Sequence, residues 1–147
     1  MKKITIYTIA LLPLTILAGC ASVDVRPVSK IHNISHVCIE NNPKVVVANF
    51  TTIVADVFQD HGITTKMYNA PVPNKCEYKL TYTALRSWDF KPYLSHAELR
   101  LFKKNKRIGY AEYHITGGSI SFSLKKWASV KKKMTPVINK LLAQYKK

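Results

Sequence analysis

The chain has 147 residues, which fits one domain with a hydrophobic core of its own. Its hydrophobic fraction of 47% is typical of a globular protein. The charge is less typical, because 23 Lys and Arg against 8 Asp and Glu give a formal net charge of +15. Such a surplus favours acidic partners, such as nucleic acid, phosphate-bearing lipid or an anionic membrane surface.

The N-terminal segment has the pattern of a secretory signal peptide. A positive start, MKK, precedes an apolar run of 14 residues, Ile4 to Leu17, and the small residues Ala18 and Gly19 close it. The run is shorter than the roughly 20 residues that a membrane-spanning helix needs, and Pro13 weakens a helix within it. We therefore expect the segment to be removed.

The end of this segment, Leu17-Ala18-Gly19-Cys20, resembles the lipobox of bacterial lipoproteins at all four positions. The resemblance implies that residues 1–19 are cleaved off and that Cys20 becomes an N-terminus carrying several acyl chains, enough for stable membrane binding. Ala21 stands where inner-membrane lipoproteins of enteric bacteria often carry Asp, which favours the outer membrane. The expected location is the cell envelope, lipid-anchored and facing the periplasm.

This location changes the meaning of the positive charge. Loss of Lys2 and Lys3 lowers the formal side-chain charge from +15 to +13. Nucleic acid is normally absent from the periplasm, so we expect no nucleic-acid partner unless the protein is found elsewhere. The expected partners are the membrane, through the acyl chains on Cys20, and an envelope protein or an anionic envelope surface such as lipid phosphates or peptidoglycan carboxylates.

Cys38 and Cys76 remain once Cys20 is set aside. An even pair in an oxidising compartment predicts a disulfide, which would stabilise the fold by roughly 4 kcal/mol on the chain-entropy model. Two separately buried thiols are the alternative. A catalytic thiol is disfavoured because neither cysteine lies in a CxxC motif or beside a histidine.

Residues 21–34 are polar, contain a proline and show no clear period, so we interpret residues 20–34 as a lipidated N-terminus and tether. A single domain then covers residues 35–147. His32 and His36 are four residues apart, a spacing that suits a metal on a helix. No helical apolar stripe accompanies them, so no metal site is expected there.

The first half of the domain predicts two strands around a helix. Val37 and Ile39 alternate with polar residues in a strand over 35–41. Asn42 followed by proline resembles a helix start, an apolar stripe predicts a helix over about 43–61, and Gly62 fits its end. A short strand follows over 63–68.

The second half predicts a strand over about 76–87 and then a hairpin. The hairpin covers about 95–115 and turns at 104–106, with Ala97, Leu99 and Leu101 on the buried face. The same register places His96 opposite His114 and puts polar residues outside: Glu98, Arg100, Tyr110 and Glu112. Two histidines without a nearby third ligand predict no metal site.

The C-terminal segment predicts an amphipathic helix from Trp127 onward, with Pro136 either kinking it or starting a second helix. An apolar stripe faces one way and lysines the other. The helix either packs on the sheet with solvated lysines or binds a membrane surface, and the two interpretations are compatible. The lysines expected to contact an anionic surface are Lys125, Lys126, Lys132, Lys133 and Lys140.

These elements predict an α+β fold, with one mostly antiparallel five-stranded sheet and two helices on one face, in the order β-α-β-β-β-β-α. No GxSxG, HExxH, Walker-type or CxxC motif occurs, and no catalytic residue, metal or cofactor is predicted. We therefore expect a non-enzymatic binding module of the envelope. The alternative is an enzyme that acts on cell-wall or lipid material.

Three short motifs extend the resemblance to lipoproteins: Leu99-x-Leu101, Ile108-Gly109-Tyr110-Ala111 and Leu124-Lys125-Lys126-Trp127. Together with a final helix that contains proline, they are similar to a small uncharacterised family of Gram-negative lipoproteins, the Sbal-type family. This resemblance would cover the whole mature chain. It implies no particular activity.

Overall fold

The computed structural model describes residues 21–115 and 124–145, so Cys20 and the signal segment lie outside the described residues. Within these ranges the chain forms six strands, two α-helices and two short 3-10 helices. In chain order the elements are β1 Ala21–Arg26, η1 Lys30–His32, β2 His36–Glu40, α1 Phe50–Asp60, β3 Thr64–Tyr68, β4 Tyr78–Asp89, β5 Lys91–Lys103, β6 Lys106–Ile115, η2 Leu124–Trp127 and α2 Val130–Leu141.

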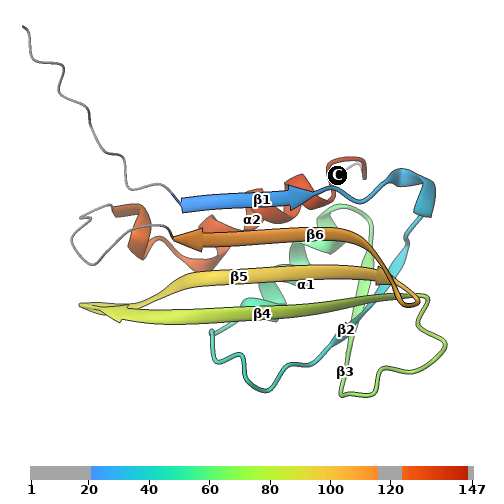
Figure 1. Ribbon diagram of the computed structural model, residues 1–147, viewed down its shortest axis with the longest axis horizontal. Helices are drawn as coiled ribbons and strands as arrows, with labels where there is room; N and C mark the ends of the chain where they lie inside the picture. Colours follow the sequence, from blue (N-terminus) through green and yellow to red (C-terminus); the bar gives the residue numbers. More distant parts are fainter. Residues whose placement is uncertain (1–20, 116–123, 146–147) are drawn as a thin grey trace, which may run out of the picture.

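The six strands form one mixed sheet with the order β1-β6-β5-β4-β2-β3 (Figure 1). Neighbouring strands are antiparallel from β1 through β6 and β5 to β4, whereas β2 runs parallel to both β4 and β3. The α+β class is thus confirmed. The predicted sheet is wrong in having five strands instead of six, and the prediction did not identify the two parallel pairs that β2 forms. Strands β2 and β3 are parallel because α1 connects them as a crossover.

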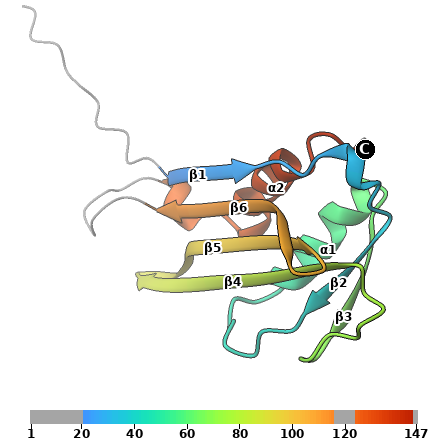
Figure 2. The same ribbon diagram turned by 45° about the vertical axis from the view of Figure 1, so that its right-hand side comes forward.

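Both helices cover the same face of the sheet, as predicted (Figure 2). Alternating side chains of β4, β5 and β6 point toward them and form the core with the apolar faces of α1 and α2. The largest fully buried side chains come from all of these elements: Phe50, Phe58, Ile39, Ile63, Leu80, Leu99, Leu101, Met134, Ile138, Leu141 and Leu142. The opposite face of the sheet carries no helix among the described residues.

Helix α1 begins at Phe50, seven residues later than the predicted start at residue 43. Asn42 does accept a hydrogen bond from the backbone of Lys44, but this closes a local turn. Its backbone and side-chain amides donate to Tyr82 of β4 and so hold Asn42 at the sheet. The chain must therefore cross from the sheet to the helix layer before α1 can start.

The predicted end of α1 is confirmed at Gly62. Its φ of +74° lies in the left-handed region, which favours glycine. The amide of Gly62 donates to Gln59 and the amide of Ile63 donates to Phe58, which together satisfy the last carbonyls of the helix. Ile63, fully buried, then leads into β3.

The segment expected to be a tether instead belongs to the folded domain. Strand β1 pairs with β6 along its whole length, from Ala21 opposite Ile115 to Arg26 opposite Tyr110. Beyond it, Val28 is fully buried and its amide donates to Leu141 of α2. The tether prediction is therefore wrong for residues 21–34. The alternation of Val23 and Val25 with polar residues was a signal of this strand, but a short one.

Gly109 on β6 allows the chain after β1 to approach the sheet. A Cβ atom at this position would lie 2.4 Å from Cγ2 of Val28 and 3.1 Å from Leu141. Only glycine leaves room for this contact without displacement of Val28. The requirement shows how tightly the N-terminal segment is packed.

Helix α2 runs from Val130 to Leu141 and passes through Pro136, so of the two alternatives a second helix start at Pro136 is wrong. The hydroxyl of Ser129 accepts a hydrogen bond from the backbone of Lys132 and caps the helix N-terminus. Trp127, expected inside the helix, lies on η2 instead.

The hairpin register is confirmed, with Ala97, Leu99 and Leu101 opposite Tyr113, Ala111 and Gly109. A register shift after Leu101 brings Lys103 opposite Lys106, so the turn is tighter than the three-residue loop expected. Because the shift lies at the turn, it leaves the pairing of the outer-face residues as predicted.

Candidate functional site

The described chain starts directly in the sheet, because Ala21 is the first residue of β1. The end of the sheet where Ala21 lies opposite Ile115 also contains the turn between β4 and β5 (Figure 1). We call this end of the molecule the Ala21 end. The predicted lipidation site, Cys20, is its covalent neighbour and lies outside the described residues.

The turn between β4 and β5 presents exposed aromatic side chains at the Ala21 end. Trp88 is 73% exposed and Phe90 is 76% exposed. Lys91 beside them is exposed as well. The Phe90 ring lies edge-on to Trp127 of η2, with 6.2 Å between ring centroids. We call Trp88, Phe90 and Lys91 the aromatic tip, a pattern that sequence alternation alone did not single out.

A groove of about 490 Å³ lies between strand β1 and helix α2, close to the same end. We call it the α2 groove. It is lined by Ala21, Val23, Tyr113, Ala128, Lys132, Lys133, Pro136, Val137 and Lys140. Because its floor is largely apolar and lysines stand beside it, the groove suits an amphipathic ligand with a negative group.

Four of the five predicted surface lysines have described side chains, and their exposure to solvent differs sharply. Lys132 and Lys140 are exposed at the α2 groove, where they can meet anions. Lys133 is only 5% exposed, as is Lys126 on η2, so the prediction of a solvated lysine face is wrong for these two. The side chain of Lys125 lies outside the described residues.

Lys133 lies between α2 and the sheet. Its Nζ donates to the backbone oxygens of Leu94, at 2.9 Å, and Lys126, at 2.6 Å. The rings of Tyr93 and Tyr113 lie 5.5 and 5.7 Å from the ammonium. Burial lowers the pKa of Lys133 from 10.5 to about 8, because the charged form loses its hydration.

Lys126 is buried beside a carboxylate. Its Nζ donates to Oδ2 of Asp89 at 2.5 Å and lies 4.9 Å from the Tyr93 ring. The hydrogen bond to Asp89 raises the pKa of Lys126, so the ammonium stays charged. Trp127 donates its indole N–H to the backbone oxygen of Asp89. These contacts attach η2 to the base of the aromatic tip.

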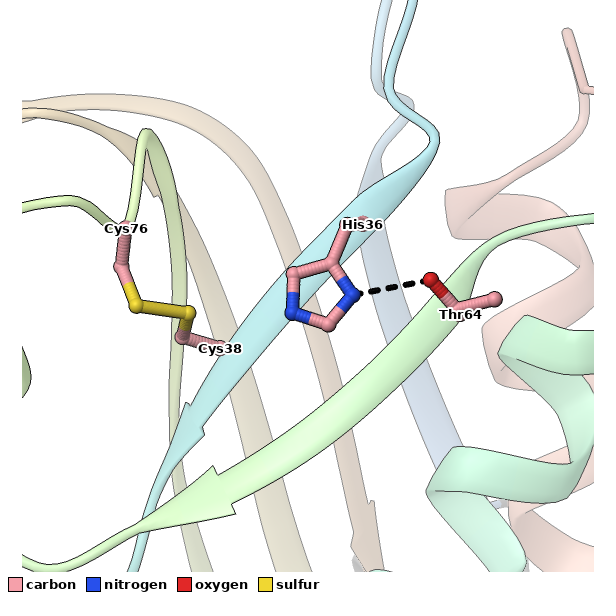
Figure 3. Close-up of a disulfide and its surroundings, with 4 residues drawn as sticks. All are labelled: His36, Cys38, Thr64 and Cys76. Atoms are coloured by element: carbon pink, nitrogen blue, oxygen red, sulfur yellow. Dashed lines mark hydrogen bonds between the residues drawn. A yellow bond between two sulfur atoms is a disulfide. The ribbon is translucent and has the colours of Figure 1, made fainter.

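The predicted disulfide joins Cys38 of β2 to Cys76, just before β4 (Figure 3). Their Cα atoms are 6.0 Å apart. The bridge joins neighbouring strands, since Cys38 pairs with Lys79 across β2 and β4. His36 lies beside this bridge and its Nδ1 shares a hydrogen bond with Thr64 on β3, at 2.8 Å (Figure 3). The bridge supports the parallel part of the sheet.

The outer face of the hairpin gathers titratable side chains, as the register predicted. His96 lies opposite His114, with ring centroids 5.5 Å apart. Glu98 and Glu112, predicted on the same outer face, both approach His96, at 3.3 and 3.7 Å between ring nitrogens and carboxylate oxygens. His96, Glu98 and Glu112 are half-buried and lie on the face of the sheet that carries no helix among the described residues.

No helix within residues 21–115 and 124–145 combines the length and the apolar character required to cross a bilayer. Helices α1 and α2 both pack on the sheet instead.

Comparison with solved structures assigns the fold. The chain resembles a PelC dodecamer from Paraburkholderia phytofirmans with a TM-score of 0.53 at 16% sequence identity, over 80% of this chain and 97% of PelC. A single-substitution variant of the same PelC, also a dodecamer, gives a TM-score of 0.51 at 17% identity over the same shares. This protein has a PelC-like fold.

No protein-family model matches the sequence. No curated protein sequence matches it either. The resemblance to the Sbal-type lipoproteins therefore gains no support, and the PelC-like fold is the relationship that the comparisons establish.

Proposed function

We propose that the protein is a lipid-anchored protein of the bacterial cell envelope that faces the periplasm and acts as a non-enzymatic binding module. The observation that carries this proposal is the direct connection between the lipobox cysteine and the sheet. Cys20 precedes Ala21, and Ala21 already pairs with Ile115. A residue spans about 3.4 Å, so acyl chains on Cys20 would hold the Ala21 end against the bilayer.

The chemistry of the Ala21 end supports this orientation. The aromatic tip extends about 10 Å beyond the level of Ala21, since three residues of β5 separate Pro92 from the level of Ile115. Trp side chains are enriched at membrane interfaces, and lysines can lie along apolar surface with the ammonium in water. Trp88 and Lys91 thus have the character of interfacial residues.

The anchor is tested in a Gram-negative host grown with an alkyne-labelled fatty acid. We expect the wild-type protein to be labelled and to fractionate with the outer membrane. Cys20→Ala should remain unlabelled and retain its signal peptide. A Cys38→Ser/Cys76→Ser variant is the matched control and should keep the label. An unlabelled wild-type protein would contradict the proposal.

The orientation is tested separately with tryptophan fluorescence, because the chain has two tryptophans. A Trp127→Phe variant reports Trp88 alone, and Trp88→Phe reports Trp127. On vesicles that contain brominated lipids, we expect strong quenching of Trp88 and weaker quenching of Trp127, whose N–H is bonded to Asp89. Equal quenching of both, or none, would contradict contact between the tip and the membrane.

The PelC-like fold supports a second element of the proposal, that the protein associates with copies of itself. The solved PelC structures are dodecamers. Light scattering of the detergent-purified protein after size exclusion would measure the mass of the assembly. A monomer at all concentrations would contradict self-association and leave the lipid anchor unaffected.

The alternative function, an enzyme acting on cell-wall or lipid material, requires a nucleophile or acid–base pair in a cleft. The α2 groove offers lysines and one tyrosine, which suit binding better than hydrolysis. Turnover of purified peptidoglycan or phospholipid by the protein, lost in Lys132→Ala, would favour the enzyme.

A further inference from the structure

The open face of the sheet concentrates acidic side chains in a basic protein. Asp24 of β1, Glu112 of β6 and Glu98 of β5 lie directly opposite one another across three adjacent strands. They are three of only eight acidic residues in the chain. Like charges that face each other across a ladder destabilise a sheet, so cations close to this row stabilise it.

His96 lies next to this row and faces two of its members. Its Nε2 is 3.3 Å from Oε1 of Glu98, and its Nδ1 is 3.7 Å from Oε1 of Glu112. All three side chains are half-buried. Each side chain offers one ligand atom, a ring nitrogen or a carboxylate oxygen, and these three atoms lie within 4.8 Å of one another. We call His96, Glu98 and Glu112 the His–Glu cluster.

The second oxygen of each carboxylate is held by another residue. Arg100 contacts Oε2 of Glu98, and the Tyr110 hydroxyl donates to Oε2 of Glu112 at 2.6 Å. Both Oε1 atoms are therefore oriented toward His96. Supporting contacts around the ligands of a metal site orient them and preserve their geometry.

From this geometry we propose that the His–Glu cluster binds a divalent transition-metal ion. A tetrahedral ion with bonds of 2.0–2.1 Å has ligand atoms about 3.4 Å apart, which is close to the 3.3 Å between Nε2 of His96 and Oε1 of Glu98. Oε1 of Glu112 faces the other ring nitrogen, Nδ1, so the Glu112 side chain must rotate to reach an ion bound at Nε2. An imidazole with two carboxylates suits Zn²⁺ and its neighbours better than Mg²⁺ or Ca²⁺. His114, the other histidine of the hairpin, lies edge-on to His96 with 5.5 Å between ring centroids.

The sequence predicted no metal site on the hairpin because only His96 and His114 were counted as ligands. The structure adds the two carboxylates, which come from both strands of the hairpin and meet at one point because Glu98 pairs with Glu112. The proposal does not depend on the lipid anchor or on self-association, since all of its ligands belong to one hairpin of one chain.

The test uses the purified lipidated protein in detergent, freed of metal with a chelator and then titrated with ZnCl₂. We expect one Zn²⁺ per chain by calorimetry and by elemental analysis after desalting. His96→Gln and Glu112→Gln are close in size to the native residues, and each should weaken Zn²⁺ binding at least tenfold. Circular dichroism checks that both variants fold.

His36→Gln is the matched control, because His36 is an exposed histidine bonded to Thr64 far from the cluster. It should bind Zn²⁺ like the wild type. Co²⁺ provides a spectroscopic check, since visible absorption typical of a four-coordinate site should appear in wild type and disappear in Glu112→Gln. Absence of Zn²⁺ binding would overturn the proposal. Binding unchanged in both cluster variants would overturn it as well.

Discussion

On the helix-covered face of the sheet, Lys126 and Lys133 carry positive charge into the interior, whereas on the open face Glu98 and Glu112 carry negative charge at half-buried positions. Each buried lysine has its own oxygen acceptors, so its charge is compensated within the domain. The two glutamates face each other and share a limited set of cations. The type of residue therefore did not predict which charged side chains have a partner within the domain.

The largest effect is expected at Lys133. Replacement by alanine leaves the carbonyls of Leu94 and Lys126 without their donor and opens a cavity, so Lys133→Ala should lower the free energy of unfolding by about 3 kcal/mol. Urea denaturation measures it. Lys132→Ala, one residue away on the exposed side of α2, should change stability by less than about 0.5 kcal/mol. Equal losses of stability in the two variants would contradict the placement of Lys133 in the interior and Lys132 on the surface.

The second expected effect is a dependence of the free energy of unfolding on pH, which arises from the lowered pKa of Lys133. Its pKa of about 8 lies below the usual lysine pKa of 10.5, so between these pH values the unfolded chain binds a proton that the folded chain lacks. The free energy of unfolding should therefore rise from pH 7 to pH 10, by about 2 kcal/mol. Lys133→Met should remove this rise, and Lys132→Met should keep it.

Above pH 10 the sign should reverse. Burial raises the pKa of Tyr113 and Tyr145, so the unfolded chain loses these protons first and stability falls as the pH increases. A stability that falls steadily from pH 7 upward would contradict a neutralised Lys133 in the interior.

The smallest effect concerns the open face. In the metal-free protein, Glu112→Gln removes one of two facing negative charges and keeps an acceptor for the Tyr110 hydroxyl. Stability should increase by about 0.5 kcal/mol. Glu77→Gln gives the opposite sign, a small loss, because Glu77 is paired with Lys103 at 3.1 Å. Thermal unfolding at low ionic strength measures both, and a loss in Glu112→Gln would show that the carboxylates are already compensated.

Local patterns predicted the parts of the molecule whose partners are close in the sequence. The pairing of His96 with His114 followed from alternation on either side of one turn, and Gly62 marked the end of α1 by its freedom to adopt positive φ. The pairing of Cys38 with Cys76 followed from the compartment and the number of cysteines. These features depend on few residues, so one sequence carries enough information for them.

The features that were missed depend on distant segments. Strand β1 is mostly exposed at the sheet edge and has only Val23 and Val25 as an apolar signal, so its strand character becomes apparent only from its pairing with β6. The predicted start of α1 was wrong because Tyr82, forty residues away, holds Asn42 at the sheet.

The sequence by itself determined the hairpin register, the disulfide and the end of α1, because each depends on a local pattern or on counting. Tertiary structure alone decided that β2 runs parallel to its neighbours, that the segment after Cys20 is part of the sheet, and that Lys133 lies inside while Lys132 lies outside. The physical reason is that burial and compensation of charge arise from contacts between segments far apart in the chain, such as Lys133 with Leu94, which periodicity within one segment does not encode.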